Sequence, residues 1–279
     1  ISKSQIYIGC QGNAIYDNSY IKLVSIFFSN SVSQQNDQNK LNKLGHYFLI
    51  NKSDFKYTDK LIKLIEKILN KFDFIKKESF SKISSLDKYG SKRIAQTIIG
   101  IKQVKYSGPK KNYDKNFLIK RVNIRDINQY LLHRNQKINM KRMINFKKIS
   151  ALDHYNWWLS NDFFARKTFK VISGNKILLY IWHKNIKINN SSYYVGGWFV
   201  ANKECKISDV YASLKWQLKT TRSKNKKWIA VINMNNKIVL KLNNLLGFSK
   251  DFNSKKDYKN SKNFFQVSPK KFSYQIYPT

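Results

Sequence analysis

Short apolar runs alternate with helical segments over residues 1–100, and this alternation constrains the fold more than any other feature of the chain. The apolar runs are 5–9, 23–28 and 47–50. The helical segments are 14–22, a stretch through Leu41 and Leu44 that stops at Gly45, and 58–70, whose apolar residues recur at amphipathic spacing. Strands that alternate with helices across short loops predict a parallel α/β sheet.

A break in this pattern divides the chain. Residues 101–116 contain Gly108, Pro109 and several lysines but no periodicity, which is typical of a linker or of an edge strand followed by a linker. Strands are then predicted at 117–122, 168–173, 177–183, 193–200 and 228–232, and helices at 126–132, 151–160, 210–218 and 237–246. The sequence predicts domains over 1–100 and 117–249, the linker 101–116, and a basic polar tail over 250–279 that is either loose or wraps around the protein.

The charge of the chain is strongly positive, with 53 Lys and Arg against 16 Asp and Glu and a formal net charge of +37. Nucleic-acid binding is nevertheless not favoured, because most of these residues are Lys, whereas Arg supplies most bidentate contacts to phosphate and guanine. Ile, Asn, Lys, Tyr and Phe are abundant everywhere, which indicates an AT-biased coding sequence. The charge would still attract anionic ligands from a distance.

The two cysteines, Cys10 and Cys205, lie far apart and outside any Cys/His cluster. This pattern argues against a disulfide scaffold and predicts no metal site. No apolar run approaches the ~18 residues of a membrane span, and no signal-peptide pattern is present. These features predict a cytoplasmic protein.

The turn after the first predicted strand, 9–17, resembles the G-G-x-T-x-x-E turn of the C-terminal half-domain of GT-B-fold proteins. Gly12 keeps the second glycine, whereas Gln11, Ala14 and Asp17 replace the first glycine, the Thr and the Glu. Residues 34–45 and 86–94 are similar to further motifs of that fold, the latter to a branch of UDP-sugar hydrolases of pseudaminic-acid biosynthesis. The resemblance implies a Rossmann-like half-site for a sugar nucleotide at Gly12, Asn13, Asp17 and Gln34. The alternative is that Gly12 only makes a turn and Asp17 only starts a helix.

In GT-B proteins of this branch the catalytic His comes from an N-terminal domain that this sequence does not contain. The resemblance therefore implies that an N-terminal half-domain is missing here and that this chain alone does not hydrolyse a sugar nucleotide. His46 follows a glycine and is expected to cap or pack rather than to replace that residue.

The stretch 133–157 resembles the W-R-N…R-x-x-M…I-S-x-x-x-H-x-x-W pattern of GNAT N-acetyltransferases that act on UDP-amino-sugars. The matching residues are Arg134, Asn135, Met143, Ile149, Ser150, His154 and Trp157. Residues 232–236 and 245–248 look like the closing V-x-x-x-N…L-G-F of that α+β fold. The resemblance implies His154 and Asn236 as catalytic residues, Arg134, Asn135, Met143 and Trp157 as substrate contacts, and Val195 and Gly196 in a bulged central strand that binds acetyl-CoA.

Two positions depart from this family. The region expected to hold the diphosphate of acetyl-CoA, 208–221, contains no glycine, which leaves Lys215, Lys219 and Arg222 as candidate phosphate contacts. Asn243 stands where a Tyr often protonates the departing thiolate. His154 either deprotonates an amine or is a packed residue beside its two tryptophans.

Taken together, these resemblances predict acetyl transfer from acetyl-CoA to the amino group of a UDP-linked amino-sugar, in the synthesis of nonulosonic (pseudaminic- or legionaminic-type) surface glycans. The strand at 228–232 is expected to diverge from its neighbours, with His154 and Asn236 facing the groove. The alternative is a non-catalytic module that holds a sugar nucleotide or a partner.

Overall fold

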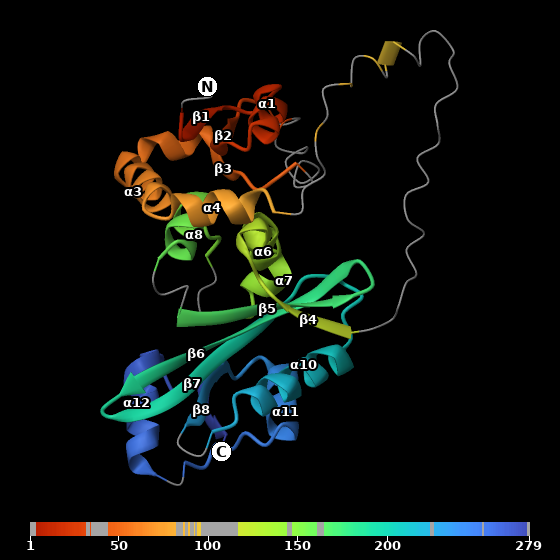
Figure 1. Cartoon of the computed structure of the whole chain (residues 1–279). Helices are drawn as coiled ribbons and strands as arrows, with labels where there is room; N and C mark the ends of the chain where they lie inside the picture. Colours follow the sequence, from red (N-terminus) through yellow and green to blue (C-terminus); the bar gives the residue numbers. More distant parts are fainter. Residues whose placement is uncertain are drawn as a thin grey trace. The chain divides into compact units, whose positions relative to one another are not determined.

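The computed structural model describes residues 4–31, 34, 44–81, 86, 89, 92, 94–95, 117–143, 147–160, 165–223, 226–252 and 254–277 (Figure 1). The chain forms two compact units that interleave along the sequence. The first comprises Ile1–Asp114, Asn123–Gln129 and Ser150–Leu159, and the second comprises Lys115–Val122, Tyr130–Ile149 and Ser160–Thr279. The segment 150–159, which the sequence assigns to the second domain, therefore packs with the first. The predicted linker 101–116 lies outside the described residues.

A parallel sheet of three strands forms the centre of the first unit, as predicted. The strands are β1 (Ile6–Cys10), β2 (Val24–Ser29) and β3 (Phe48–Asn51), in the order β1-β2-β3. Its helices are α1 (Ala14–Tyr20), the 3-10 helix η2 (Lys52–Lys56), α3 (Thr58–Leu69), α4 (Phe72–Ser79), the 3-10 helix η3 (Ile124–Asp126) and α8 (Ala151–Trp158). Because β2 is buried along nearly its whole length, its sequence reads as a continuous apolar run.

Helix α8 is held in the first unit by buried polar contacts. The Tyr155 hydroxyl accepts a hydrogen bond from the Leu49 N–H at 2.9 Å and donates one to Asn128 Oδ1 at 2.7 Å. Lys67 of α3 and Lys71, the N-cap of α4, donate to main-chain carbonyls at the C-terminal end of α8, at 2.5 and 2.7 Å. Cations are favourable there, because the last carbonyls of a helix have no partner within it.

The second unit is built on a sheet of six strands in the order β4-β5-β6-β7-β8-β9. The strands are β4 (Phe117–Arg121), β5 (Arg166–Ser173), β6 (Lys176–Ile188), β7 (Ser191–Val200), β8 (Lys227–Asn233) and β9 (Phe272–Tyr277). The helices are α6 (Ile127–Arg134), in which the chain passes from one unit to the other, α7 (Lys137–Met140), α10 (Ile207–Thr220), α11 (Lys237–Leu245) and α12 (Lys255–Phe265). Within this six-stranded sheet, neighbouring strands are antiparallel, except that β7 and β8 are parallel. The molecule is thus a mixed α/β protein with two sheets.

The described part of the predicted tail, 254–277, packs on the second unit and adds a strand to its sheet. Strand β9 pairs with Trp228–Asn233 of β8, and α12 packs against both strands. Within α12, Asp257 accepts hydrogen bonds from the Tyr193 hydroxyl at 2.6 Å and from Lys227 Nζ at 2.7 Å. Asn260 donates to the same tyrosine oxygen at 2.9 Å. A polar composition therefore conceals a segment with buried polar anchors.

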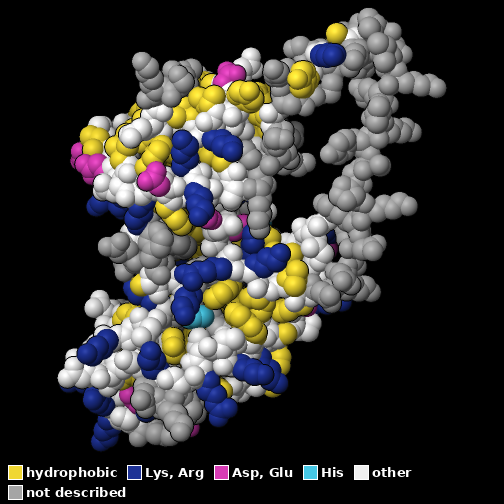
Figure 2. Space-filling model, viewed as in Figure 1, with side chains coloured by type: hydrophobic (Ala, Val, Ile, Leu, Met, Phe, Trp, Pro, Cys, Tyr) yellow, Lys and Arg dark blue, Asp and Glu magenta, His cyan; other side chains and the backbone are white. Residues whose placement is uncertain are grey.

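Lys and Arg side chains are scattered over the face seen in Figure 2 in both units. Beneath them, one face of the large sheet packs against α10 and α11 through an apolar cluster that includes Leu179, Ile181, Leu214 and Leu242. A second cluster on β7, β8 and β9 includes Tyr193, Val195, Ile229 and Ile276. The sheet is thus packed in two places, which fixes the positions of β7 and β8.

Candidate functional site

Strands β7 and β8 run parallel but diverge, as predicted. They pair only at Tyr193 with Lys227 and at Tyr194 with Trp228. From Val195 onward, the facing edges of the two strands make no ladder with each other among the described residues. A parallel pair that stops early leaves main-chain N–H and C=O groups which an extended ligand can bind by adding to the edge.

The bulge expected in the central strand is absent. Strand β7 pairs with β6 in unbroken register from Leu179–Val200 to Ile188–Ser191. The two glycines in β7 instead make room for tryptophans. A Cβ on Gly196 would lie 2.6 Å from Trp228 Cζ3, and a Cβ on Gly197 would lie 3.0 Å from Trp182 Nε1.

Val195 and Gly196, predicted as acetyl-CoA contacts, have their side-chain positions surrounded by protein. The Val195 side chain is buried beside Ile229. Any contact of these two residues with a ligand would therefore be made by the main chain of β7.

The glycine-free segment 208–221 is not a phosphate-binding loop, because nearly all of it is helix α10. Lys206 is the N-cap, and its N–H donates to Asp209 Oδ2 at 2.8 Å. The N-terminus of α10 thus has a carboxylate of its own, which is placed where the helix dipole favours an anion. A phosphate at that end of the helix would have to lie close to Asp209.

Lys215, Lys219 and Arg222 lie toward the opposite end of α10. Lys215 is exposed in the second half of the helix, Lys219 is in the last turn, and Arg222 follows it. At 1.5 Å per residue, the 14 residues of α10 span about 21 Å, so Lys219 is far from the N-terminal turn. These cations instead favour the C-terminal end of the helix dipole.

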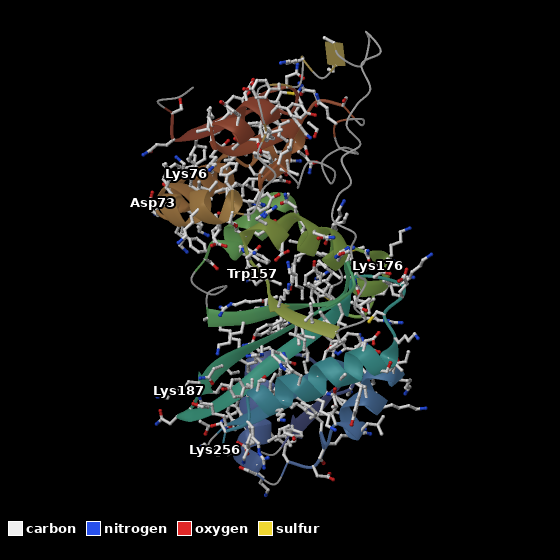
Figure 3. The ribbon with its side chains drawn as sticks, turned by 45° about the vertical axis from the view of Figure 1, so that its right-hand side comes forward. Asp73, Lys76, Trp157, Lys176, Lys187 and Lys256 are labelled. Carbon is white, nitrogen blue, oxygen red and sulfur yellow. The ribbon has the colours of Figure 1, made fainter. Side chains whose placement is uncertain are left out.

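His154 does not face an open groove. It is 2% exposed on α8, in the first unit, and its ring centroid lies 5.8 Å from that of Trp157 and 5.4 Å from that of Trp158. A general base must reach the proton that it takes, so this burial favours the packing alternative. Trp157, a predicted substrate contact, is half-buried on the same helix (Figure 3).

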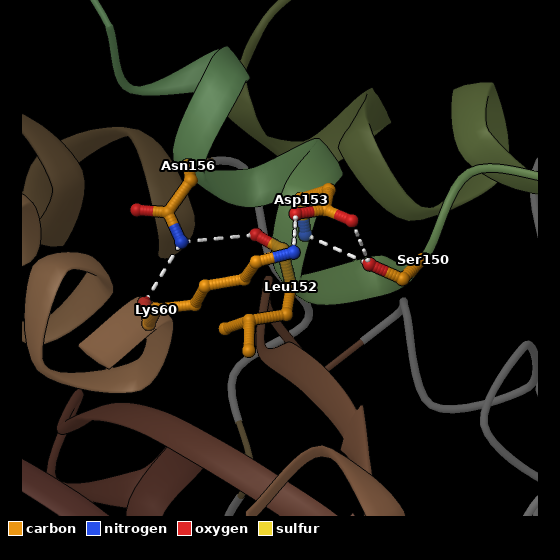
Figure 4. A network of polar contacts seen from close by, with 5 residues as sticks. All are labelled: Lys60, Ser150, Leu152, Asp153 and Asn156. Carbon is orange, nitrogen blue, oxygen red and sulfur yellow. Dashed lines mark hydrogen bonds and ion pairs between the residues drawn. The ribbon is translucent and has the colours of Figure 1, made fainter. Parts of the chain in front are cut away.

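The exposed side of α8 carries a polar network with α3 (Figure 4). Lys60 Nζ forms an ion pair with Asp153 at 2.7 Å, and Ser150 caps the helix by accepting from the Asp153 N–H at 3.0 Å. Asn156 donates to the Lys60 carbonyl at 2.9 Å. The two contacts with Lys60 join α8 to α3, and the Ser150 contact caps α8 itself.

Asn236 and Asn243 both have structural partners. Asn236 is the N-cap of α11, and its Oδ1 accepts from the Val239 N–H at 3.4 Å. Asn243 is 7% exposed and donates to Gln275 Oε1 of β9 at 2.9 Å. Asn243 therefore does not supply the proton donor that a Tyr at this position would.

The remaining predicted substrate contacts of the second unit lie at the end of α6 and in the segment that follows it. Asn135 donates to the Ile149 carbonyl at 2.8 Å and accepts from the Ile149 N–H at 3.0 Å, which closes the loop between them. Arg134 is 6% exposed, and burial lowers the pKa of its guanidinium despite the nearby Tyr130. Met143 is half-buried at the end of the described part of this loop.

In the first unit, Gln34 and the turn after β1 meet at one edge of the parallel sheet. Gln34 Oε1 accepts from the Asn30 N–H at 2.9 Å and from the Cys10 thiol at 3.8 Å. Asp17 is exposed in the first turn of α1, and Asn13 is its N-cap without a side-chain hydrogen bond. A Cβ on Gly12 would meet no atom within 4 Å, so packing does not require a glycine there. Most of the other residues that resemble the GT-B motifs lie outside the described part of the chain.

Sequence reasoning did not single out Gln275 and Asp257, which the structure buries at the ends of hydrogen-bond networks. The available signal was the alternation in 272–277, where Phe272, Tyr274 and Ile276 face one side of the strand and Gln275 the other. Among the described residues, no group of His, Cys, Asp and Glu could hold a metal ion. None of the helices in the described ranges has the length and apolarity that crossing a bilayer requires.

No family model matches the chain, and no curated protein matches its sequence. Similar solved structures include a domain from Methanocaldococcus jannaschii DSM 2661, with 19% identity and a TM-score of 0.41 over 58% of this chain and 98% of that one. Spermidine N-acetyltransferase from Vibrio cholerae, solved with CoA and spermine, has 12% identity and a TM-score of 0.42 over 50% of this chain and 84% of that one. The Campylobacter jejuni N-acetyltransferase PseH has 14% identity and a TM-score of 0.37 over 58% of this chain and 98% of that one.

Proposed function

We propose that the second unit binds acetyl-CoA along the open edges of β7 and β8 and transfers the acetyl group to the amine of an amino-sugar, which is UDP-linked. The observation that carries this proposal is the early end of the β7–β8 pairing, two residue pairs after it begins. Main-chain donors and acceptors exposed in this way suit the amides of an extended pantetheine arm. In this proposal the product serves nonulosonic-acid surface glycan synthesis.

Acetyl-CoA supplies an acetyl group activated as a thioester. In this proposal, the N–H groups on the open edge of β7 orient the thioester and stabilise the charge that develops on its oxygen. His154 is too buried to accept the amine proton, and the Asn243 amide is bonded to Gln275. The amine therefore enters as the free base, and water takes up and returns the protons. Transfer should accordingly be slow, and its rate should follow the titration of the sugar amine.

The same observations favour a second candidate, a module that binds without catalysis. Asn236 caps a helix, Asn243 is engaged by β9, and Asp209 occupies the N-terminus of α10. A fold that has kept its open strand edges and lost its proton-transfer groups could hold acetyl-CoA or a sugar nucleotide without turnover. Binding and transfer must therefore be measured separately.

The deciding experiment is a calorimetric titration of the full chain with acetyl-CoA, followed by an assay of thiol release with a UDP-4-amino-sugar. We expect weak, salt-sensitive binding and slow transfer. Asp209→Asn removes the carboxylate charge beside the expected diphosphate and should tighten acetyl-CoA about three- to tenfold. Asp251→Asn, at another exposed carboxylate, is the matched control. Failure of acetyl-CoA to bind at millimolar concentration contradicts the proposal, and binding without thiol release favours the second candidate.

We further propose that the first unit contributes a half-site for the nucleotide at Gly12, Asn13, Asp17 and Gln34. The support is that Gln34 and the turn after β1 meet at the carboxyl edge of a parallel sheet, where α/β proteins commonly bind nucleotides. UDP should bind with a Kd in the high micromolar to millimolar range, about −4 to −6 kcal/mol. Asp17→Ala should weaken UDP but not inorganic phosphate, and an equal response to UDP and phosphate contradicts the half-site.

A further inference from the structure

His183 lies on β6 opposite Gly196 of β7, close to the point where the pairing of β7 with β8 ends. On the sheet, it stands between Lys167 of β5 and Gly196 of β7. Directly opposite residues of neighbouring strands point to the same face, so His183, Lys167 and Gly196 share the face covered by α10. Helix α10 ends beside this point, since Gln217 in its last turn contacts the His183 ring.

Three aromatic side chains contact His183, and a fourth packs against one of them. The Phe169 ring is stacked on it, with centroids 5.7 Å apart and an interplanar angle of 28°. Tyr194 and Trp228 each present an edge to the other side, with centroids 6.0 Å away. Trp216 packs edge-on against Phe169 at 5.2 Å. Phe169, Tyr194 and Trp216 are only half-buried, so part of their ring surface is open to solvent.

The imidazole of His183 is a neutral hydrogen-bond donor. Nδ1 lies 3.2 Å from Gln217 Nε2, an amide N–H, so Nδ1 accepts and the ring proton is on Nε2. Nε2 has no hydrogen-bond partner in the described ranges, although the residue is 5% exposed. Burial, together with Lys167 and Arg121, lowers the pKa of His183 to about 4, so the ring is uncharged near neutral pH.

Three cations border the same aromatic rings. Arg121 stands opposite Phe169 on β4, Lys167 opposite His183, and Lys226 Nζ lies 5.5 Å from the centre of the Tyr194 ring. None of them has an acidic partner within the part of the chain that the structure describes.

We propose that this surface, made of Phe169, His183, Tyr194, Arg121, Lys167 and Lys226, binds a mononucleotide. Half-buried aromatic rings offer stacking faces for a heteroaromatic base, which is worth ~1–3 kcal/mol per base where it has been measured in proteins. The His183 Nε2–H can donate to a base carbonyl or a ring nitrogen, and the cations suit a phosphate. The site adjoins the start of the open edges of β7 and β8. It consists of side chains on one face of the sheet, whereas the acetyl-CoA contacts proposed above are main-chain groups between the two strands, so it goes beyond that function.

The test is titration of the full chain with AMP and UMP, read by calorimetry and by the ¹⁵N shift of His183 Nε2. Adenosine and inorganic phosphate are the partial ligands, and each should bind at least tenfold more weakly than AMP. Excess acetyl-CoA should leave AMP binding unchanged. Displacement of AMP by acetyl-CoA in proportion to its occupancy overturns the proposal, because the ligand would then belong to the β7–β8 edges.

Variants separate the phosphate contacts from the fold. Lys167→Ala combined with Lys226→Ala should weaken AMP about tenfold and leave adenosine unchanged, whereas Lys241→Ala, at an exposed position of α11, should change neither. An equal loss of AMP affinity in the double variant and in Lys241→Ala overturns the proposal. A second result also overturns the proposal: affinity for oligouridylate rises steadily with its length, and AMP does not change the ¹⁵N shift of His183 Nε2. That result indicates a surface that binds polyanions in general.

Discussion

Helices α8 and α12 are both docked by an aspartate that pairs with a lysine at 2.7 Å, yet the two ion pairs differ in burial. The side chains of Asp153 on α8 and of its partner Lys60 on α3 are 50% and 48% exposed, so water solvates both charges. On α12, Asp257 is 10% exposed and Lys227 is 43% exposed. An exposed pair gains ~0–1 kcal/mol at most, whereas removal of one partner of a buried pair leaves a charge without compensation.

The two ion pairs have the same N–O distance, so that distance does not distinguish the helices. What they share is a contact with the hydroxyl group of a buried tyrosine. Tyr193 donates to Asp257 on α12, and Tyr155 bridges Leu49 and Asn128 on α8. Both tyrosines are 1% exposed. On α12, the aspartate of the ion pair is also the residue that bonds the buried tyrosine. On α8, the ion pair and the buried tyrosine are separate contacts. This difference can be tested by substitution.

Asp257→Ala should produce the largest effect. It leaves the Tyr193 hydroxyl and Lys227 without their acceptor, and we expect a loss of about 2 kcal/mol in the free energy of unfolding. This is below the ~3–5 kcal/mol of a fully buried pair because Lys227 remains partly solvated. Urea denaturation and hydrogen exchange of α12 amides measure it, with exposed Asp251→Ala as the control. Equal stability of the two variants would show that α12 is held only by apolar contacts.

Tyr155→Phe should have the next largest effect, on the first unit. The part-buried Leu49 N–H and Asn128 Oδ1 lose their partner. A fully buried unsatisfied group costs ~1–3 kcal/mol, so we expect about 1.5 kcal/mol for these two groups. Protection of α8 amides against hydrogen exchange should fall accordingly. Tyr57→Phe, at an exposed tyrosine, should leave it unchanged. Unaltered protection in Tyr155→Phe would remove the hydroxyl as the anchor of α8.

Acid should act on the α12 anchor with a smaller effect. Burial alone raises the pKa of Asp257, but hydrogen bonds from Lys227 and Tyr193 and nearby lysine charges outweigh it and hold the pKa below its ordinary value. The folded state therefore favours the carboxylate. This stabilisation is complete above the unfolded pKa of about 4 and is lost as pH falls through the lower folded pKa. Denaturation at a series of pH values should show the advantage of the native protein over Asp257→Asn narrowing below pH ~4; an advantage independent of pH contradicts this account.

Lys60→Ala should have the smallest effect. Hydrogen bonding to Asp153 raises the pKa of Lys60, but both side chains are solvated and Ser150 still bonds to the carboxylate. We expect no resolvable change in the unfolding midpoint. Lys67→Ala, which removes a donor to the C-terminal end of α8, should lower the midpoint more. A larger loss of stability in Lys60→Ala than in Lys67→Ala would show that the exposed ion pair contributes to the docking of α8.

The elements that could be predicted from the sequence are those whose burial is expressed in apolar runs. Strand β2 is an example, because burial on both faces requires a continuous apolar stretch. Strand β9 escaped prediction because two of its buried residues, Ser273 and Gln275, are polar. Local composition cannot reveal a polar residue whose partner, here Asn243, lies on a distant helix.

The candidate site was harder to predict than the fold. The divergence of β7 and β8 was expected from the family resemblance, not from the strand pattern alone, and is present in the structure. His154 illustrates the limit, since helical spacing shows which residues share a face of α8 but not that Tyr155 docks this helix on β3. Lys215 and Lys219 illustrate another limit. They were assigned to the diphosphate of acetyl-CoA, but both lie in the second half of α10, away from its N-terminus.

Strand β9 also has a consequence for synthesis on the ribosome. It is translated after all the other strands, and until it emerges the outer edge of β8 exposes unpaired N–H and C=O groups beside the buried side chains of Trp228 and Ile229. The inner edge offers little protection, because β7 pairs with β8 at two residues only. Exposed strand edges of this kind promote association between chains. The nascent protein should therefore depend on chaperone shielding until β9 has been made.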